Sequence, residues 1–194
     1  MLSRGRRLGS GGRPPQAVAG SRPHESIPRS GSGRGSTRSA SPPGNVEPVT
    51  TIAPLTSADR DDWLPLWQGY LTFYESELAD EVTDAVFARL VAGDGVHGVL
   101  ARDDDGRAVG FVHWLYHPST WSLGPYCYLE DLFVAPDVRG GGVGRALIAH
   151  VRDDAARAGA AKVYWLTQES NATARTLYDR VADLSGFVHY QIQL

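Results

Sequence analysis

The chain has 194 residues, which is enough for one domain with a substantial hydrophobic core and some excess. Its formal net charge of −3 combines two unlike parts: residues 1–48 hold eight Arg against two Glu, a net of +6, which leaves −9 on residues 49–194. A single cysteine, Cys127, excludes a disulfide-stabilised scaffold, and no apolar stretch approaches the ~20 residues of a membrane span. We therefore expect a cytoplasmic protein with an acidic domain, for which nucleic acid is not a favoured partner.

Residues 1–48 are rich in Gly, Ser, Pro and Arg and have almost no large apolar side chains. Such a segment cannot bury enough surface to offset the entropy of ordering it, so we predict that it is disordered. It could be a basic tether for a polyanion, a targeting sequence, or the product of a mis-assigned start. It lacks the apolar core of about 7–15 residues that a secretion signal carries. We favour a tail without function or a mis-assigned start, and place the folded domain at residues 49–194.

The first half of that domain shows helical and then strand-like patterns. The predicted elements are a short strand from residue 49, a helix that begins at Thr56 or Ser57 and carries Trp63 to Phe73, a helix over 80–93, and strands over 96–103 and 108–117. The buried face of the second helix is expected to carry Val82, Val86, Phe87 and Leu90. The two strands meet at a turn with Asp-Gly chemistry, which predicts a hairpin.

A third strand, residues 126–134, leads into a glycine-rich loop and a helix. The loop has Gly at four of five positions, and the apolar residues after it recur at helical spacing. Strand, loop and helix in this order aim the free N–H groups of the helix N-terminus at an anion, most often a phosphate. The loop lacks the Gly-Lys-Ser/Thr of a P-loop and the GxGxxG of a dinucleotide site, but it fits R-x-x-G-x-G, read as Arg139, Gly142 and Gly144.

The rest of the chain predicts a strand over 161–167, a helix over 170–184 capped by Ser170 or Asn171, and a closing strand over 186–194. The complete predicted order is β-α-α-β-β-β-α-β-α-β.

The R-x-x-G-x-G loop between this strand and this helix resembles the acetyl-CoA pyrophosphate loop of the GNAT family of N-acetyltransferases. The order of elements over residues 49–194 is also similar to that family's. The resemblance implies an α/β (α+β) fold with a mixed central sheet flanked by helices. The stretches "YLEDLFV", "RGGGVGRALI" and "WLTQESNATARTLYDR" most resemble the branch that holds diamine and histone N-acetyltransferases.

The resemblance also implies where acetyl-CoA binds. Backbone groups of Leu132, Phe133 and Val134 would bond the pantetheine arm like an added strand. The pyrophosphate would lie on the loop, whose residues are Arg139, Gly140, Gly141, Gly142, Val143, Gly144 and Arg145, and Asn171 would be a further cofactor contact. No His/Cys cluster has metal-ligand spacing, so no metal is expected.

Acetyl transfer to an amine needs a base, because an ammonium with a pKa of about 10.4 is almost fully protonated at neutral pH, and an acid for the departing thiolate. The resemblance implies Glu130 as the base, acting through water, and Tyr178 as the acid. Asn171 and Tyr178 are seven residues apart and so share one helix face. Alternatively, Glu130 is a carboxylate paired with an Arg, and Tyr178 is a packed ring. The N–H of Leu132 is expected to hold the oxyanion.

Aromatic faces beside carboxylates suit an aliphatic ammonium, and an acidic domain attracts cations. The expected acceptor-site residues are Trp67, Tyr70, Tyr74, Glu75, Asp131 and Trp114, although several could instead be core residues. Strict alternation turns Asp131 away from Glu130, but a bulge, common in this strand of the family, would re-aim both. His113 and His189 are alternative bases, although a lone His on a strand is more often structural.

We therefore expect an enzyme that moves acetyl from acetyl-CoA to a primary amine by direct attack, without a covalent enzyme intermediate. The acceptor would be a small molecule or lysine-type amine: a polyamine, an amino acid or a lysine. A homodimer is compatible with this expectation. The alternative is an acyl-CoA-binding sensor with the same fold and little turnover, against which the presence of both Glu130 and Tyr178 argues.

Overall fold

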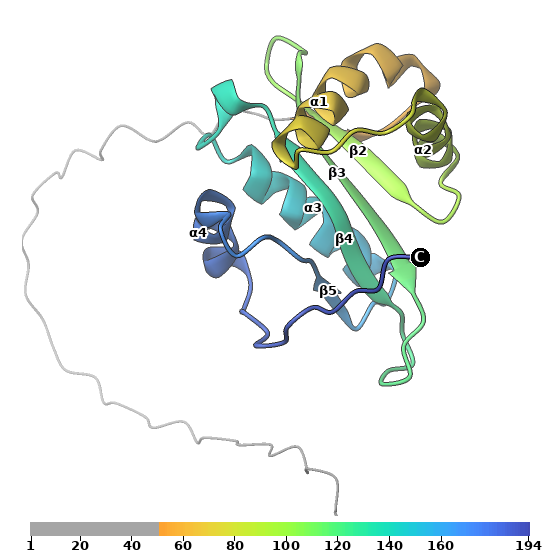
Figure 1. Cartoon of the computed structure of the whole chain (residues 1–194), viewed down its shortest axis with the longest axis vertical. Coiled ribbons are helices and arrows are strands. Elements are labelled where there is room, and N and C mark those ends of the chain that lie inside the picture. The colour runs from red at the N-terminus through yellow and green to blue at the C-terminus, as the bar shows by residue number, and fades with distance from the viewer. Residues whose placement is uncertain (1–50) are drawn as a thin grey trace, which may run out of the picture. The chain divides into compact units, whose positions relative to one another are not determined.

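A computed structural model describes residues 51–194, and the predictions made for residues 1–48 lie outside the described residues. The elements in chain order, shown in Figure 1, are β1 (Thr51–Pro54), a 3-10 turn η1 (Ser57–Asp59), α1 (Arg60–Phe73), α2 (Asp80–Ala92), β2 (His97–Arg102), β3 (Ala108–His117), β4 (Tyr126–Val134), a 3-10 turn η2 (Pro136–Val138), α3 (Val143–Arg157), β5 (Lys162–Tyr164) and α4 (Ala172–Val181).

Five strands form one mixed sheet in the order β1-β2-β3-β4-β5. Strands β1 to β4 pair with one another in antiparallel fashion, whereas β5 is parallel to β4. A parallel pair needs a crossover rather than a hairpin, and α3 provides it. The expected fold class, a mixed sheet flanked by helices, is confirmed.

Helices cover both faces of the sheet and bury a core on each (Figure 1). On one face, α3 packs an apolar stripe that includes Leu147 and Val151 against β3 and β4. On the other face, α1 and α2 bury Trp63 and Phe87 against the strand residue Phe111. The two faces therefore present separate sets of side chains from the same strands.

The buried face of α2 differs from the predicted one at a single position. Val82 is 44% exposed, while Thr83 is buried with Phe87 and Leu90. Thr83, Phe87 and Leu90 follow each other at spacings of four and three residues, which keeps them on one side of the helix. Val82 is displaced from that side by one residue.

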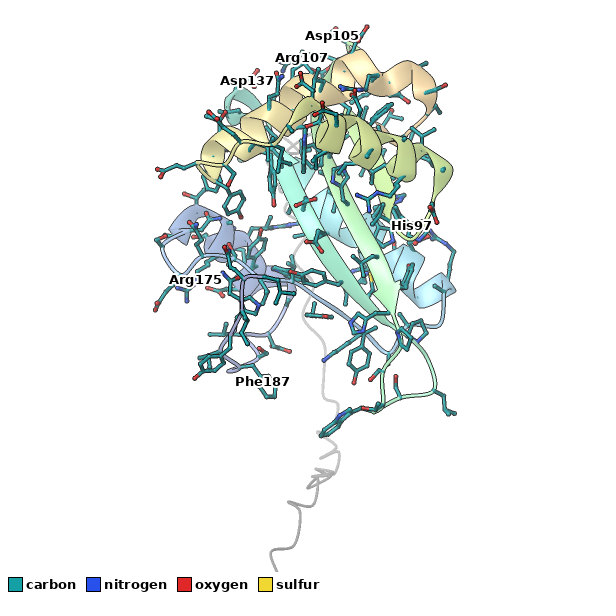
Figure 2. All side chains as sticks on the ribbon, turned by 45° about the vertical axis from the view of Figure 1, so that its right-hand side comes forward. His97, Asp105, Arg107, Asp137, Arg175 and Phe187 are labelled. Carbon is teal, nitrogen blue, oxygen red and sulfur yellow. The ribbon has the colours of Figure 1, made fainter. Side chains whose placement is uncertain are left out.

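The prediction of a closing strand at residues 186–194 is wrong. The segment after α4 pairs with no strand of the described chain, and Phe187, Tyr190 and Ile192 are 92%, 88% and 89% exposed. Figure 2 shows Phe187 at the periphery of the domain. An apolar–polar alternation favours a strand, but a strand also needs a partner edge that supplies its backbone hydrogen bonds. For the same reason β5 ends at Tyr164, where its pairing with β4 ends, and not at residue 167.

Candidate active site

Strands β4 and β5 separate part-way along their length. β5 pairs only with Tyr126, Cys127 and Tyr128, while β4 continues to Val134. The edge of β4 beyond Tyr128 therefore has no strand partner on the β5 side within the described residues. Leu132, Phe133 and Val134, predicted to bind the cofactor arm, lie on this free edge. An extended ligand can add to such an edge through main-chain hydrogen bonds.

The glycine-rich loop lies between the end of β4 and α3. Gly140 and Gly142 have φ values of 86° and 89°, a conformation that residues with a Cβ rarely adopt, and Gly142 is the N-cap of α3. The first intrahelical bond runs from the Ala146 N–H to the Gly142 carbonyl at 3.0 Å. The N–H groups of Val143, Gly144 and Arg145 precede that bond and have no carbonyl partner within the helix. The loop thus has the geometry of an anion site.

Two arginines flank this loop with exposed side chains, and they differ in their contacts. Arg139 donates from Nε to the Val134 carbonyl at 3.1 Å, and its guanidinium lies 5.8 Å from the centre of the Phe133 ring. It therefore links the loop to β4, and its other N–H groups remain available to a ligand. Arg107 of the β2–β3 turn pairs with Asp137 of η2 at 2.7 Å, which fixes the other side of the loop (Figure 2).

A β-bulge brings the two acidic residues of β4 into one group. Leu129 and Asp131 pair with the adjacent residues Trp114 and His113 of β3, so Glu130 is the extra residue. Leu129 packs on the α3 face, whereas Asp131 bonds His113 on the α1 face. The prediction from strict alternation, that Asp131 turns away from Glu130, is wrong, and the alternative with a bulge is confirmed.

Burial and charge perturb the titration of this group. Desolvation of the carboxyl, followed by the charge of Asp131, raises the pKa of Glu130 although the residue as a whole is exposed. Burial, then the charge and hydrogen bonding of Asp131, raise the pKa of Tyr70 far above its ordinary range. Burial, followed by the charge of Glu130, raises the pKa of Tyr128 to about 12. The site thus combines one carboxylate of increased proton affinity, Glu130, with tyrosine hydroxyls that stay protonated at neutral pH.

Helix α4 contributes the residues predicted to act on the other side of the separated strands. Asn171 is its N-cap, accepting from the Ala174 N–H at 3.3 Å and donating from Nδ2 to Thr167 Oγ1 at 3.2 Å. The Tyr178 ring lies edge-on to Trp165, with centroids 5.3 Å apart. Burial and then the neighbouring Tyr74 raise the pKa of Tyr178 to about 12, so its hydroxyl keeps its proton at neutral pH.

The residues predicted for the acceptor site fall into three groups. Tyr70 and Tyr74 lie at the end of α1, and burial followed by the charge of Asp131 raises the pKa of both. Trp67 is buried, stacked on Tyr70 at 5.4 Å, so it supports the site from the core. Glu75 is exposed just beyond α1, with a left-handed φ of 51°. Tyr70, Tyr74 and Asp131 therefore share one electrostatic environment with Glu130.

Placing Trp114 in the acceptor site is contradicted by the structure. Trp114 belongs to the core on the α3 face, and its Nε1 donates to Asp154 of α3 at 3.1 Å. Tyr116 donates to the same carboxylate at 2.7 Å. Side chains two residues apart on a strand share a face, and from Val112 to Tyr116 that face is the one opposite α1.

His113 is a fully bonded structural residue on the α1 face. Its two ring nitrogens contact Trp63 and Asp131 at 3.1 and 3.0 Å. His189, the other alternative base, lies in the exposed segment after α4. Both nitrogens of the His113 ring are therefore occupied by protein partners.

Three residues beyond the predicted ones also lie beside this group: Tyr128, Tyr164 and Thr167. Tyr128 pairs with Tyr164 in the parallel register, and the Thr167 side chain partly offsets the burial that raises the pKa of Tyr74. A signal existed for Tyr128, which lies two residues before Glu130 in the same strand. Within residues 51–194, no group of three potential ligands could hold a metal ion, and no helix is long and apolar enough to cross a membrane.

Comparison with known proteins identifies relatives over most of the domain. The model of the acetyltransferase (GNAT) family matches residues 60–182. A D-amino-acid N-acetyltransferase of Saccharomyces cerevisiae is 34% identical over 142 residues, which are 72% of this chain and 88% of the relative. A thialysine N-epsilon-acetyltransferase of Caenorhabditis elegans is 32% identical over 91 residues, 47% of this chain and 56% of the relative.

Solved structures agree with these relationships. A ribosomal-protein-alanine N-acetyltransferase from Brucella melitensis superposes with a TM-score of 0.62 at 25% identity, covering 75% of this chain and 100% of that one. An aminoglycoside N-acetyltransferase in complex with CoA has a TM-score of 0.66 at 19% identity. The match covers 77% of this chain and 98% of that one, and shows the same fold. The matched family model, the relatives and the shared fold lead to one conclusion: the chain belongs to the GNAT family of acetyltransferases.

Proposed function

We propose that this acetyltransferase moves the acetyl group of acetyl-CoA directly to a primary amine of a small molecule or lysine-type acceptor. The observation that carries the proposal is the grouping at the point where β4 and β5 separate: Glu130 and Asp131 of the bulge, with Tyr74 joining them to Tyr178 of α4. This grouping supports a base and an acid at the entrance to a free strand edge, a pair that a pure binding protein does not need.

The residues present fit a phosphate-bearing thioester ligand. The amides at the start of α3 and the charges of Arg139 and Arg145 suit a pyrophosphate, and a side chain added at Gly140 would meet no atom within 4 Å, so the loop is open to a ligand. The free edge of β4 suits an extended pantetheine arm. When bound, acetyl-CoA supplies the activated acyl group.

Glu130 acts as the base in this proposal. It accepts, directly or through water, the proton of the attacking ammonium, and its raised pKa makes it a stronger acceptor than an ordinary carboxylate. The amine nitrogen forms a bond to the acyl carbon, and the bond from that carbon to sulfur breaks. Tyr178 donates its proton to the departing thiolate, and the Leu132 N–H stabilises the negative charge that develops on the carbonyl oxygen.

The acceptor is an amine that meets tyrosine rings and carboxylates. Tyr70, Tyr74 and Tyr128 surround the acidic pair and suit an aliphatic ammonium. The relatives named for D-amino acids and thialysine favour amino-acid-like amines, and the resemblance to diamine acetyltransferases favours polyamines. Both acceptor classes carry the primary ammonium that this site suits.

A panel of amines tests the proposal, with acetyl-CoA as the donor and release of free thiol as the measurement. The panel contains polyamines, D- and L-amino acids and a lysine peptide, and calorimetry measures acetyl-CoA binding separately. We expect thiol release with at least one class of amine. Tight binding of acetyl-CoA without thiol release from any amine would instead support the acyl-CoA sensor.

A further inference from the structure

A chain of two hydrogen bonds runs from the core of α1 to the bulge in β4. Trp63 Nε1 donates to His113 Nε2 at 3.1 Å, and His113 Nδ1 lies 3.0 Å from Asp131 Oδ2. Trp63 is 0% exposed and His113 is 3% exposed. Water does not reach these two rings, so their polar atoms depend on the protein partners.

The indole group fixes the protonation of the histidine. An indole N–H can only donate, so His113 Nε2 must be the unprotonated, accepting nitrogen. The single ring proton then lies on Nδ1, which donates it to Asp131. A second proton on Nε2 would face the Trp63 N–H, and neither group could accept. Trp63 therefore fixes a neutral imidazole with its proton directed at the carboxylate.

A neutral donor orients Asp131 without cancelling its charge. Among the described residues, His113 is the partner recorded for Asp131 at ion-pair distance, and the Asp131 side chain is 15% exposed. Asp131 follows directly after Glu130, the extra residue of the bulge. The uncompensated charge of Asp131 thus acts on Glu130.

We propose that His113 is a positioning residue for the base of acetyl transfer: it holds the charged Asp131 carboxylate beside Glu130 and so makes Glu130 a stronger proton acceptor. The proposal rests on the role of Glu130 given above. It assigns the buried Trp63–His113–Asp131 chain a function beyond packing.

The groups that face Glu130 come from three elements. They are Tyr128 and Asp131 of β4, Tyr70 of α1 and Tyr164 of β5. Burial is the first cause that raises the pKa of each of these tyrosines, so they are neutral at neutral pH. Asp131 is thus the charged member of this set, and its charge adds to the effect of burial in raising the pKa of Glu130.

Two substitutions separate the two hydrogen bonds of His113. The amide of His113→Gln reaches the place of Nε2, which keeps a partner for Trp63 and removes the donor to Asp131. The amide of His113→Asn reaches the place of Nδ1 and keeps that donor. Without the His113 donor, Asp131 keeps its contact with Tyr70 but loses the bond that fixes Oδ2, so its carboxylate turns away from Glu130.

The measurement is the pH dependence of kcat/KM, whose acidic limb reports uptake of a proton by the free enzyme's base. We expect His113→Gln to move this limb to lower pH by about 1 unit, as Asp131→Asn does, and His113→Asn to leave it at the wild-type position. A wild-type limb in a folded His113→Gln variant, with unchanged circular dichroism and acetyl-CoA affinity, overturns the proposal.

Two further variants complete the test. If His113→Gln does not fold, Trp63→Phe replaces it, because loss of the indole N–H frees His113 Nε2 for a second proton. The resulting positive charge offsets that of Asp131, so the acidic limb of kcat/KM should move to lower pH. An unchanged limb in Trp63→Phe also overturns the proposal. Glu130→Gln tests the role of Glu130 as the base separately from the positioning role of His113. Wild-type kcat/KM in Glu130→Gln refutes Glu130 as the base and the positioning role with it. An impaired Glu130→Gln with an unmoved limb in His113→Gln refutes the positioning role alone.

Discussion

Each face of the sheet holds a carboxylate among aromatic side chains: Asp154 on the α3 face, and Glu130 on the α1 face. Their neighbours shift the two pKa values in opposite directions. On the α3 face, Asp154 accepts from Trp114 Nε1 at 3.1 Å, from Tyr116 at 2.7 Å and from Arg157 at 3.1 Å. Burial alone would raise the pKa of Asp154, but the bonds from Tyr116, Arg157 and Trp114 outweigh burial and lower it. This carboxylate is held as an anion.

On the α1 face, Asp131 and Glu130 lie next to each other in the bulge, and His113 bonds Asp131 as a neutral donor. Burial and the charge of Asp131 raise the pKa of Glu130. The difference between the faces lies in the donors: a guanidinium and two ring donors satisfy Asp154, whereas Glu130 has a second carboxylate as its neighbour. Similar residue types therefore give a structural anchor on one face and, in the proposed mechanism, a proton acceptor on the other.

Removing each carboxylate tests this contrast most strongly. Glu130→Gln should lower kcat/KM by about 10²–10⁴-fold, because general base help is lost, while the melting temperature stays near that of wild type since the residue is exposed. Asp154→Asn should leave kcat/KM nearly unchanged. Thiol-release kinetics and thermal unfolding measure both variants. A loss of activity in Asp154→Asn equal to that in Glu130→Gln would remove the distinction between the faces.

Loss of the proposed acid on α4, Tyr178, should have the next largest effect. Tyr178→Phe keeps the ring against Trp165 and removes the hydroxyl, so kcat should fall by at least about tenfold with little change in the KM for acetyl-CoA. The loss should shrink with a donor whose thiol is more acidic, because that thiolate needs less protonation. Tyr190→Phe removes a hydroxyl from a ring that is 88% exposed and serves as the matched control. Equal kcat in Tyr178→Phe and Tyr190→Phe would leave Tyr178 as a packed aromatic.

The loop prediction concerns binding rather than turnover. Gly142 has a φ of 89°, which Asn and Asp tolerate better than other residues with a Cβ. Gly142→Asp and Gly142→Asn share this backbone strain and differ in charge, so the Kd for acetyl-CoA should be at least about tenfold weaker in the Asp variant. Calorimetry measures both values. The same Kd in both variants would exclude a pyrophosphate at this helix end.

The smallest expected effect is on stability at the α3 face. Asp154→Asn replaces charge-assisted bonds by neutral ones and should lower the free energy of unfolding at pH 7 by about 1 kcal/mol. The lowered pKa of Asp154 means that its stabilisation is complete above the unfolded value of about 3.9 and is lost as pH falls through the folded value. The difference between variant and wild type, measured in denaturant titrations, should therefore shrink below about pH 4. A difference that stays constant down to pH 2.5 would show that the charge of Asp154 is not its cause.

Much of the fold could be predicted because its signals are local. The positive φ of Gly140 and Gly142 follows from the need for glycine in a tight loop before a helix, and the helical spacing of Leu147 and Val151 identifies the buried side of α3. The sequence restricts the N-cap of α4 to Ser170 or Asn171, and the structure identifies Asn171, whose side chain accepts from an amide three residues later.

The sequence by itself determined the residue types at the proposed site, the glycine-rich loop before α3 and the order of all the elements except the last. Only the tertiary structure decided which faces these residues share. The bulge at Glu130 depends on the register between β3 and β4, and a shift of one residue exchanges the two faces of a strand. Register and edge pairing come from contacts between distant segments, which is why Trp114 lies away from the site and the segment after α4 forms no strand.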